Sequence, residues 1–183
     1  MKRAIYKFLF TKVLRWRVEG EYPYEVKKFL ITVAPHTSFY DFPVGIFFRN
    51  WYGVQVNFII KSEIGNHKII GPFVKKMGGI SVDRKKSSNF VQSVARLYDE
   101  YDNLYICITP EGTRKKVDSF KSGFYYIARA ANIPVLPIIF DFEHKTLHIK
   151  ELVYLGENHR EEIERFENIY KGIKGKHPQQ SLA

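Results

Sequence analysis

The chain alternates short apolar runs with longer stretches in which apolar residues recur every three or four positions. From position 90 onward, for example, apolar residues occupy i, i+1, i+4, i+7, i+8 and i+11, the spacing of one helix face. Short β-branched runs such as residues 29–34 are typical of buried strands. We therefore predict strands over 29–34, 56–60, 80–82, 104–109, 135–140 and 145–153, and helices over 41–52, 87–101, 120–131 and 161–173.

Strands that alternate with helices predict an α/β fold, in which a mostly parallel or mixed sheet is flanked by helices. A length of 183 residues fits a single domain, and no internal repeat or linker interrupts the pattern. We assign this domain to residues 20–173 and expect residues 174–183 to form a disordered tail.

The first 19 residues predict a basic amphipathic helix. Six Lys or Arg residues and no acidic residue lie within positions 1–17, and the apolar residues between them follow a helical stripe as far as Leu14. Such a helix can lie in the interface of a bilayer, where each cation near an anionic leaflet contributes about 1 kcal/mol at best. It can equally pack its apolar stripe on its own domain, and this segment alone leaves both interpretations open.

Composition narrows the class of protein. With 45% hydrophobic and 26% charged residues, the chain is a folded globular protein, which excludes collagen-like and disordered classes. A single cysteine, Cys107, excludes an internal disulfide and a cysteine-rich zinc site, so we expect a reducing compartment. Since Lys7 and Lys12 interrupt the first apolar stretch and no later run suffices for a span, we expect a cytoplasmic protein without a signal peptide.

The net charge of +10 and the 16% of aromatic residues indicate an anionic partner. That partner is a nucleic acid, a membrane surface or a phosphorylated substrate, and the charge alone does not choose among them.

His36 follows the first predicted strand, at a strand end where α/β sheets place ligands. Asp41 opens the next predicted helix, and a carboxylate on one ring nitrogen would leave the other as a general base. On these two residues alone the simpler interpretation is structural, with Asp41 as a helix cap and His36 as a loop histidine.

Two further strand ends carry basic residues. Residues 109–114 read Thr-Pro-Glu-Gly-Thr-Arg, which favours a turn that presents Glu111 and Arg114, and Arg114 could bind a phosphate. Arg84 lies in a second basic cluster just before the 87–101 helix, where helix N-termini attract anions. A plain surface turn at 109–114 and a local ion pair of Asp83 with Arg84 would explain the same residues without a ligand.

Taken together, the order and spacing of these segments resemble the glycerolipid acyltransferases of the 1-acylglycerol-3-phosphate acyltransferase superfamily. The matching blocks are His36-Thr37-Ser38-Phe39-Tyr40-Asp41 for His-x-x-x-x-Asp, Gly79-Ile80-Ser81-Val82-Asp83-Arg84 for Gly-x-x-x-x-Arg, and Glu111-Gly112-Thr113-Arg114 for Glu-Gly-Thr-Arg. A proline-flanked apolar run at 133–137 resembles the fourth block, and 61–64 and 120–123 also look like family segments. The resemblance extends over residues 36–137.

The resemblance implies transfer of a fatty acyl group from acyl-CoA or acyl-carrier protein to the hydroxyl of a lysophospholipid such as 1-acylglycerol-3-phosphate. It implies that His36 is the general base and Asp41 its orienting partner, so that the reaction needs no enzyme nucleophile. The substrate-binding residues that it implies are Lys61, Arg84, Glu111, Gly112, Thr113 and Arg114. It implies neither a cofactor nor a metal.

The implied partners are the acyl thioester donor, the lysophospholipid acceptor and a membrane surface contacted through residues 1–17, without nucleic acid. Because an acyltransferase has to reach a lipid, the resemblance favours interfacial docking of the N-terminal helix. We therefore expect a cytoplasmic protein that associates peripherally with the inner face of the membrane.

The chain departs from the family pattern at Pro35, where many members have Asn, and at Lys115, where Ser is common. Nor do we expect an N-terminal transmembrane helix. These departures leave the acceptor open, and an amine- or amino-acid-containing lipid could take the place of the lysophospholipid. Two functions of a different kind also fit the charge and the motifs: a basic nucleic-acid-binding module, and a hydrolase in which water replaces the acceptor.

Overall fold

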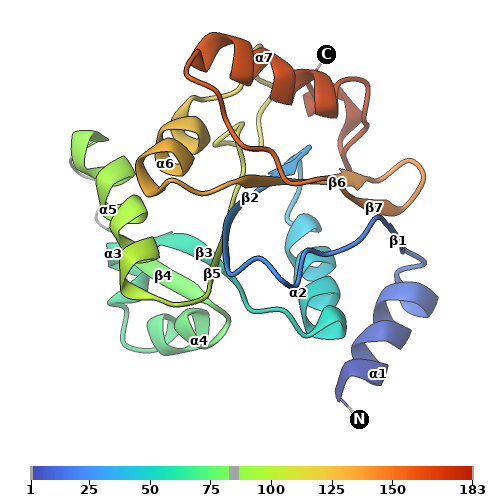
Figure 1. Ribbon diagram of the computed structural model, residues 1–183. Coiled ribbons are helices and arrows are strands. Elements are labelled where there is room, and N and C mark those ends of the chain that lie inside the picture. The colour runs from blue at the N-terminus through green and yellow to red at the C-terminus, as the bar shows by residue number, and fades with distance from the viewer. Residues whose placement is uncertain (1, 83–86, 183) are drawn as a thin grey trace.

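Figure 1 shows the protein as a computed structural model in which residues 2–82 and 87–182 are described. Across these residues, seven strands form one sheet in the order β1-β7-β6-β2-β5-β3-β4. Neighbouring strands run parallel except β6 and β7, which pair antiparallel, and this confirms the predicted mixed, mostly parallel sheet. The strands are β1 Arg17–Glu19, β2 Lys28–Ala34, β3 Val56–Lys61, β4 Gly79–Val82, β5 Leu104–Ile108, β6 Val135–Asp141 and β7 Thr146–Ile149.

Helices lie between these strands and on either side of them in the sequence. They are α1 Lys2–Phe8, the π-helix η1 Leu9–Val13, α2 Asp41–Tyr52, α3 Ser62–Gly65, α4 Ile70–Lys76, α5 Ser87–Glu100, α6 Gly123–Ala131, α7 His159–Tyr170 and the 3₁₀-helix η2 Pro178–Gln180. The predicted helix at 41–52 has the observed bounds of α2. The helix that was predicted to begin at position 120 begins at Gly123. Phe120 is instead a buried loop residue whose amide donates to Glu167 Oε1.

Helices cover both faces of the sheet, so two apolar cores form. Side chains of β2 alternate between them: Leu30 joins the core beneath α5, α6 and α7, while Phe29 and Ile31 join the core made with η1 and α2. In Figure 1, α6 and α7 lie above the sheet, whereas α1 and α2 lie below it. Burial of apolar side chains in both layers is the main force that holds the sheet in place.

The parallel strands bring the sequence motifs to one edge of the sheet. β2 pairs with β5 so that Thr32 lies opposite Ile108, and β3 lies on the other side of β5. The carboxyl ends of β2, β5, β3 and β4 therefore meet at a common edge, which we call the carboxyl edge. The loops after β2 and β5 carry His36 and Glu111 at this edge.

The N-terminal segment differs from the helix expected over residues 1–19. The helix ends with η1, Arg15 adopts a left-handed φ of 59°, and Arg17–Glu19 is a strand instead. Trp16 sets this boundary, because its buried ring packs edge-on against Phe142 at a centroid distance of 4.9 Å. Within residues 2–82 and 87–182, none of the helices combines the length and the apolar character that crossing a membrane requires.

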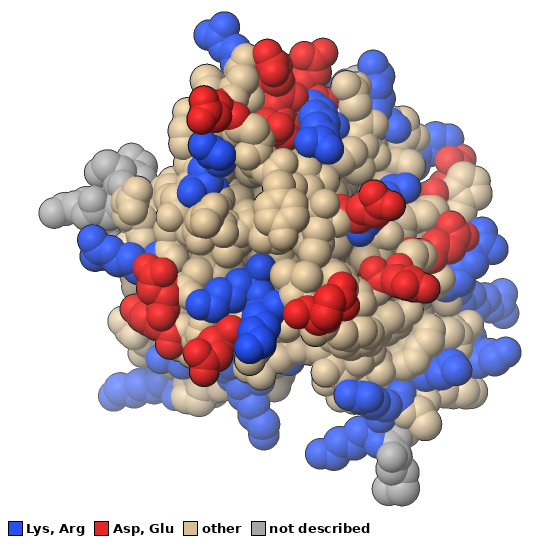
Figure 2. All heavy atoms as spheres, in the orientation of Figure 1, with Lys and Arg blue, Asp and Glu red and all other residues tan. Residues whose placement is uncertain are grey.

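The sequence left open whether the apolar residues of this segment pack on the domain or face a membrane. In the structure some of them are buried and others are exposed. Phe10 is fully buried against the domain, whereas Ile5 and Phe8 are 54% and 58% exposed. Figure 2 shows basic side chains gathered at the lower right, around α1, and a mixture of acidic and basic side chains over α7.

The C-terminal tail, which the sequence analysis expects to be disordered, packs on the domain as far as residue 182. Gly175 and Ser181 are buried, and the Gly175 amide donates to Ser181 Oγ at 2.9 Å. Leu182 packs against the core beneath α7. The structure thus differs from this expectation. The Phe142 amide donates to the Lys174 carbonyl at 3.0 Å, and a hydrogen bond of this kind leaves no periodic apolar pattern in the sequence.

Candidate active site

His36 lies in the loop that joins β2 to α2, and its ring is paired with Asp41. His36 Nδ1 lies 2.8 Å from Asp41 Oδ2, and the imidazole is 20% exposed while the carboxylate is 4% exposed. Oδ2 also accepts a hydrogen bond from the Ser38 amide at 3.1 Å, which holds the carboxylate against the loop. With Nδ1 on a carboxylate, Nε2 is the nitrogen that can accept a proton.

The simpler interpretation of Asp41 as a helix cap does not hold. Tyr40 occupies the N-cap position of α2, and no side chain caps that helix end. Asp41 is the first residue of α2, and its oxygen faces back toward the loop. Its position is therefore set by the loop and by the His36 ring.

Glu111, in the loop after β5, holds the backbone of His36. The His36 amide donates to Glu111 Oε1 at 2.9 Å and to Oε2 at 3.1 Å. The Glu111 residue is 2% exposed, and this burial raises the pKa of its carboxyl group to about 7, although the bond from His36 opposes the shift. Glu111 is thus a residue that positions His36, whereas the family resemblance implied a contact with substrate.

The turn predicted at Thr109–Gly112 is present. The Gly112 amide donates to the Thr109 carbonyl at 3.0 Å, with proline second and glycine fourth, as a β-turn favours. Gly112 has a φ of +64°, and a β-carbon there would lie 3.0 Å from Lys121 Cδ. Glycine at this position therefore allows the Lys121 side chain to lie over the turn. Lys121 was not predicted as a site residue, although it lies in the segment 120–123 that resembles the family.

Arg114 connects the two motif loops at the surface. Its Cζ lies 4.2 Å from the ring centroid of Phe39, a cation–π contact, and Phe39 is 76% exposed. Lys176 Nζ lies 5.2 Å from the ring of the exposed Tyr40. Exposed aromatic rings with cations against them therefore border the His36 loop.

The remaining predicted site residues are less closely joined to His36. Lys61 ends β3 at the carboxyl edge and is exposed. Thr113 Oγ1 accepts a hydrogen bond from the Lys115 amide at 3.2 Å and so shapes the turn. Arg84 falls outside the described residues.

The C-terminal tail packs behind the His36 loop, a feature without a sequence signal because it depends on backbone contacts. The His177 amide donates to Thr37 Oγ1 at 3.1 Å. With its amide nitrogen turned toward the loops, Gln180 donates to the carbonyl oxygens of Thr37 at 3.1 Å and Arg114 at 2.7 Å. The tail thus bridges the loops that carry the first and third blocks.

Cys107 and Ser38 have side chains that act as nucleophiles in some enzymes, but neither is arranged for that role here. Cys107 lies within β5, and burial raises the pKa of its thiol to about 12, so the unreactive protonated form persists. Ser38 Oγ accepts a hydrogen bond from the Tyr40 amide at 3.2 Å and supports the loop. The arrangement favours proton abstraction from a bound hydroxyl by His36.

A second His–Asp pair lies in the turn after β6. His144 Nδ1 is 2.7 Å from Asp141 Oδ2, and the His144 amide donates to Oδ1 at 3.0 Å. Burial alone would raise the pKa of Asp141, but these bonds outweigh it and lower the pKa. Because the carboxylate binds both ring and amide of one residue, the pair forms the turn, and the His144 ring is 61% exposed.

The sequence is similar to one family model and to several curated proteins. A model described as "Acyltransferase" matches residues 15–141. A 1-acyl-sn-glycerol-3-phosphate acyltransferase of Limnanthes alba is 28% identical over 125 residues, which are 64% of this chain and 43% of that protein. Another of Cocos nucifera is 26% identical over 146 residues, 76% of this chain and 47% of that protein. The chain thus spans less than half the length of these curated relatives.

Among solved structures, the chain is similar to the 1-acyl-sn-glycerophosphate (LPA) acyltransferase, PlsC, from Thermotoga maritima. The TM-score is 0.58 and the identity 22%, over 95% of this chain and 80% of that chain. At this identity the likeness is one of fold, and it agrees with a helix-flanked mixed sheet.

Proposed function

Because this chain belongs to the acyltransferase family, we propose that it transfers a fatty acyl group from an acyl thioester, acyl-CoA or acyl-carrier protein, to the hydroxyl of a lysophospholipid such as 1-acylglycerol-3-phosphate. The observation that carries the proposal is the 2.8 Å contact of His36 Nδ1 with Asp41 Oδ2 beside the Arg114 loop. The curated relatives that bear this activity in their names support the choice of acceptor.

In the proposed reaction, His36 Nε2 removes the proton from the acceptor hydroxyl as its oxygen attacks the thioester carbonyl carbon. Asp41 stabilises the imidazolium that forms, because its carboxylate lies on Nδ1. The tetrahedral intermediate then collapses, the carbon–sulfur bond breaks, and the leaving thiolate takes up the proton from His36. The products are an ester and a free thiol, so atoms and charges balance without a covalent enzyme intermediate.

The cations around the His36 loop suit an acceptor that carries a phosphate. Arg114 presents a guanidinium beside Phe39, and guanidinium groups bind phosphate in a bidentate manner. Lys121 lies over Gly112 in the same turn, and Lys61 ends a neighbouring strand at the carboxyl edge. We assign the acceptor phosphate to these side chains, with Arg84 as a further member of the set.

The exposed part of α1 would hold the protein at the membrane surface that contains its lipid substrate. Ile5 and Phe8 are exposed beside a run of Lys and Arg that contains no acidic residue. Apolar side chains next to cations are the composition of helices that lie in an anionic bilayer interface. We therefore propose peripheral contact with a membrane surface through α1.

A product assay tests the proposal. The protein is incubated with acyl-CoA or with acyl-carrier protein and a panel of lysophospholipids and amine-containing lipids, and thiol release and acylated lipid are measured. We expect acylated 1-acylglycerol-3-phosphate and thiol release that requires the acceptor. Thiol release at an equal rate without any acceptor would indicate a hydrolase instead.

A nucleic-acid-binding function is separated from acyl transfer by binding measurements. Association with mixed oligonucleotides that weakens steeply with salt, in a protein that forms no acylated lipid, would replace the acyltransferase proposal. We expect lipid acylation and no saturable binding of oligonucleotides.

A further inference from the structure

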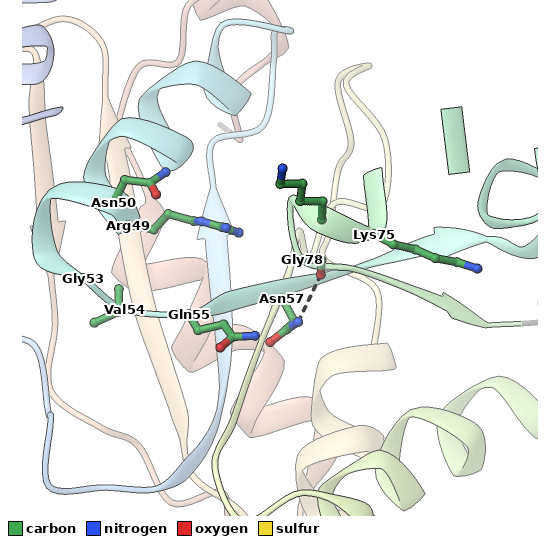
Figure 3. Close-up of a pocket in the computed structure, with 9 residues that line it drawn as sticks. Arg49, Asn50, Gly53, Val54, Gln55, Asn57, Lys75 and Gly78 are labelled. Atoms are coloured by element: carbon green, nitrogen blue, oxygen red, sulfur yellow. Dashed lines mark hydrogen bonds between the residues drawn. The ribbon is translucent and has the colours of Figure 1, made fainter. Parts of the chain in front are cut away.

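A basic pocket lies at the edge of the sheet opposite the carboxyl edge. It has a volume of about 370 Å³ and is lined by residues at the end of α2, before β3 and around the turn from α4 to β4. Figure 3 shows Arg49 reaching from α2 toward Gly78, with Gln55 and Asn57 on the β3 side. β3 has six residues, so roughly 20 Å of strand separates this pocket from the carboxyl edge.

The lining of this pocket is cationic. Arg49, Lys75 and Lys76 contribute positive charge, while Asn50, Gln55 and Asn57 contribute neutral amide groups, and none of the lining residues is acidic. Within residues 2–82 and 87–182, none of the three cations forms an ion pair with a carboxylate. Cationic and amide groups that line one cavity without a carboxylate are suited to an oxyanion.

Arg49 is a partly buried cation whose hydrogen-bonding groups are only partly satisfied. Its Nη1 donates to the carbonyl oxygens of Val56 and Met77, which ties α2 to the starts of β3 and β4. Nε and Nη2 make no hydrogen bond to the described residues, and burial lowers the pKa of the guanidinium. A partly buried cation without a counter-charge is costly, and an anion in the pocket would relieve that cost.

The pocket also adjoins the N-terminal helix. A β-carbon at Gly53, on the rim, would collide with the Arg3 guanidinium, so Arg3 of α1 lies directly against that residue. Arg3 adds a fourth cation beside the pocket and connects it to the helix that exposes Ile5 and Phe8.

We propose that this pocket binds the phosphate group of an anionic ligand, either a lipid headgroup or a soluble phosphate ester, at a site separate from the acyl-transfer site. Arg49 supplies the fixed donor, Lys75 and Lys76 supply mobile charge, and Gln55 supplies a neutral donor. The site does not depend on acyl transfer, so its test uses binding and not turnover.

The test compares a pocket variant with a charge-matched control. The pocket variant is Lys75→Gln with Lys76→Gln, because Arg49→Ala would also release the carbonyls of Val56 and Met77 and disturb the fold. The control is Lys150→Gln with Lys171→Gln, which removes the same charge from exposed positions elsewhere. Gln55→Glu is a second pocket variant, which introduces a carboxylate near Arg49 while both lysines remain.

Two probes distinguish the sources of phosphate. Calorimetric titration with glycerol 3-phosphate reports a soluble ester, and co-sedimentation with phosphatidylcholine vesicles that contain phosphatidic acid reports a lipid headgroup. Loss in the pocket variants of about tenfold in affinity for either probe, with the control unchanged, is the expected result. The affected probe identifies the source.

If the pocket variants and the control bind both probes equally well, the inference is overturned. A loss of equal size in the pocket variants and the control would also overturn it, because net charge alone would then explain the binding. Thermal melting of each variant confirms that binding is compared between folded proteins.

Discussion

At the scale of single residues, the ionisation of Glu111 makes the stability of the protein depend on pH. Burial raises the pKa of its carboxyl group from 4.5 to about 7 in the folded protein. Between these pH values the folded protein holds a proton that the unfolded chain has released. The resulting stabilisation is complete below pH 4.5 and is lost as the pH rises through 7.

The substitution Glu111→Gln tests this coupling, because glutamine keeps an acceptor oxygen for the His36 amide and does not titrate. Relative to the variant, we expect the unfolding free energy of the wild type to fall by about 3 kcal/mol as the pH rises from about 4 to about 8. Urea unfolding of both proteins across this range measures the difference. If the difference in unfolding free energy between the two proteins does not vary with pH, the raised pKa of Glu111 is contradicted.

Arg114 is the residue that should distinguish phosphorylated from uncharged acceptors. Arg114→Ala removes a charge-assisted contact, so kcat/KM for 1-acylglycerol-3-phosphate should fall by about 100-fold. For a monoacylglycerol the loss should stay below about threefold. Lys115→Ala, at the adjacent exposed position, is the matched control and should leave both values near those of the wild type. Equal losses for both acceptors in Arg114→Ala would remove its role in phosphate binding.

At the scale of the elements, α1 and η1 combine a structural face with an exposed face. Phe10 is fully buried and Trp16 is nearly so, so deletion of residues 1–17 would expose the core and confuse loss of membrane contact with loss of stability. Substitution of exposed residues alone is therefore the sharper test.

Ile5→Gln with Phe8→Gln keeps the charge of α1 and removes its exposed apolar groups. We expect the partition coefficient onto phosphatidylcholine vesicles that contain phosphatidylglycerol to fall by at least about tenfold. Co-sedimentation measures it, with Tyr101→Gln and Tyr154→Gln as the control at other exposed positions. Unchanged binding of the α1 variant would assign the segment to the domain alone.

The C-terminal tail is the element that supports the His36 loop from behind. A β-carbon at Gly175 would lie 2.5 Å from Thr37 Oγ1, so Gly175→Ala should displace the loop next to His36. We expect kcat to fall by about tenfold or more. Gly172→Ala is the control, because its β-carbon meets no atom within 4 Å and only its left-handed φ of +76° is strained. Equal activity of both variants, at a temperature below their melting points, would contradict a positioning role for the tail.

At the scale of the whole molecule, the order of strands and helices was predictable because each element carries its own periodic pattern. The bounds of α2 and the common edge for His36 and Glu111 follow from such patterns and from parallel pairing. β1 has three residues and α3 has four, and elements this short depend on tertiary contacts: Arg17 and Val18 pair with Thr146 and Leu147 across the sheet.

Sequence motifs predicted the residues of the site and the pairing of His36 with Asp41, but not the contacts that hold the His36 loop in place. The pairing of His36 with Asp41 agrees with the spacing of the first block. The role of Glu111 in holding the His36 amide arises from the register of β2 against β5, which no local pattern encodes. The support from the tail arises from hydrogen bonds with Thr37, which composition cannot indicate.

We propose that the His36 imidazole, paired with Asp41 at the carboxyl edge, is the base for acyl transfer. Thiol release from acyl-CoA in the presence of 1-acylglycerol-3-phosphate tests it, with wild type and His36→Ala compared at equal concentrations. His148→Ala is the control, because His148 also pairs with a carboxylate, Glu19, at 3.2 Å. We expect kcat to fall by about 1000-fold in folded His36→Ala and to stay unchanged in His148→Ala. A His36→Ala protein that releases thiol at the wild-type rate would contradict it.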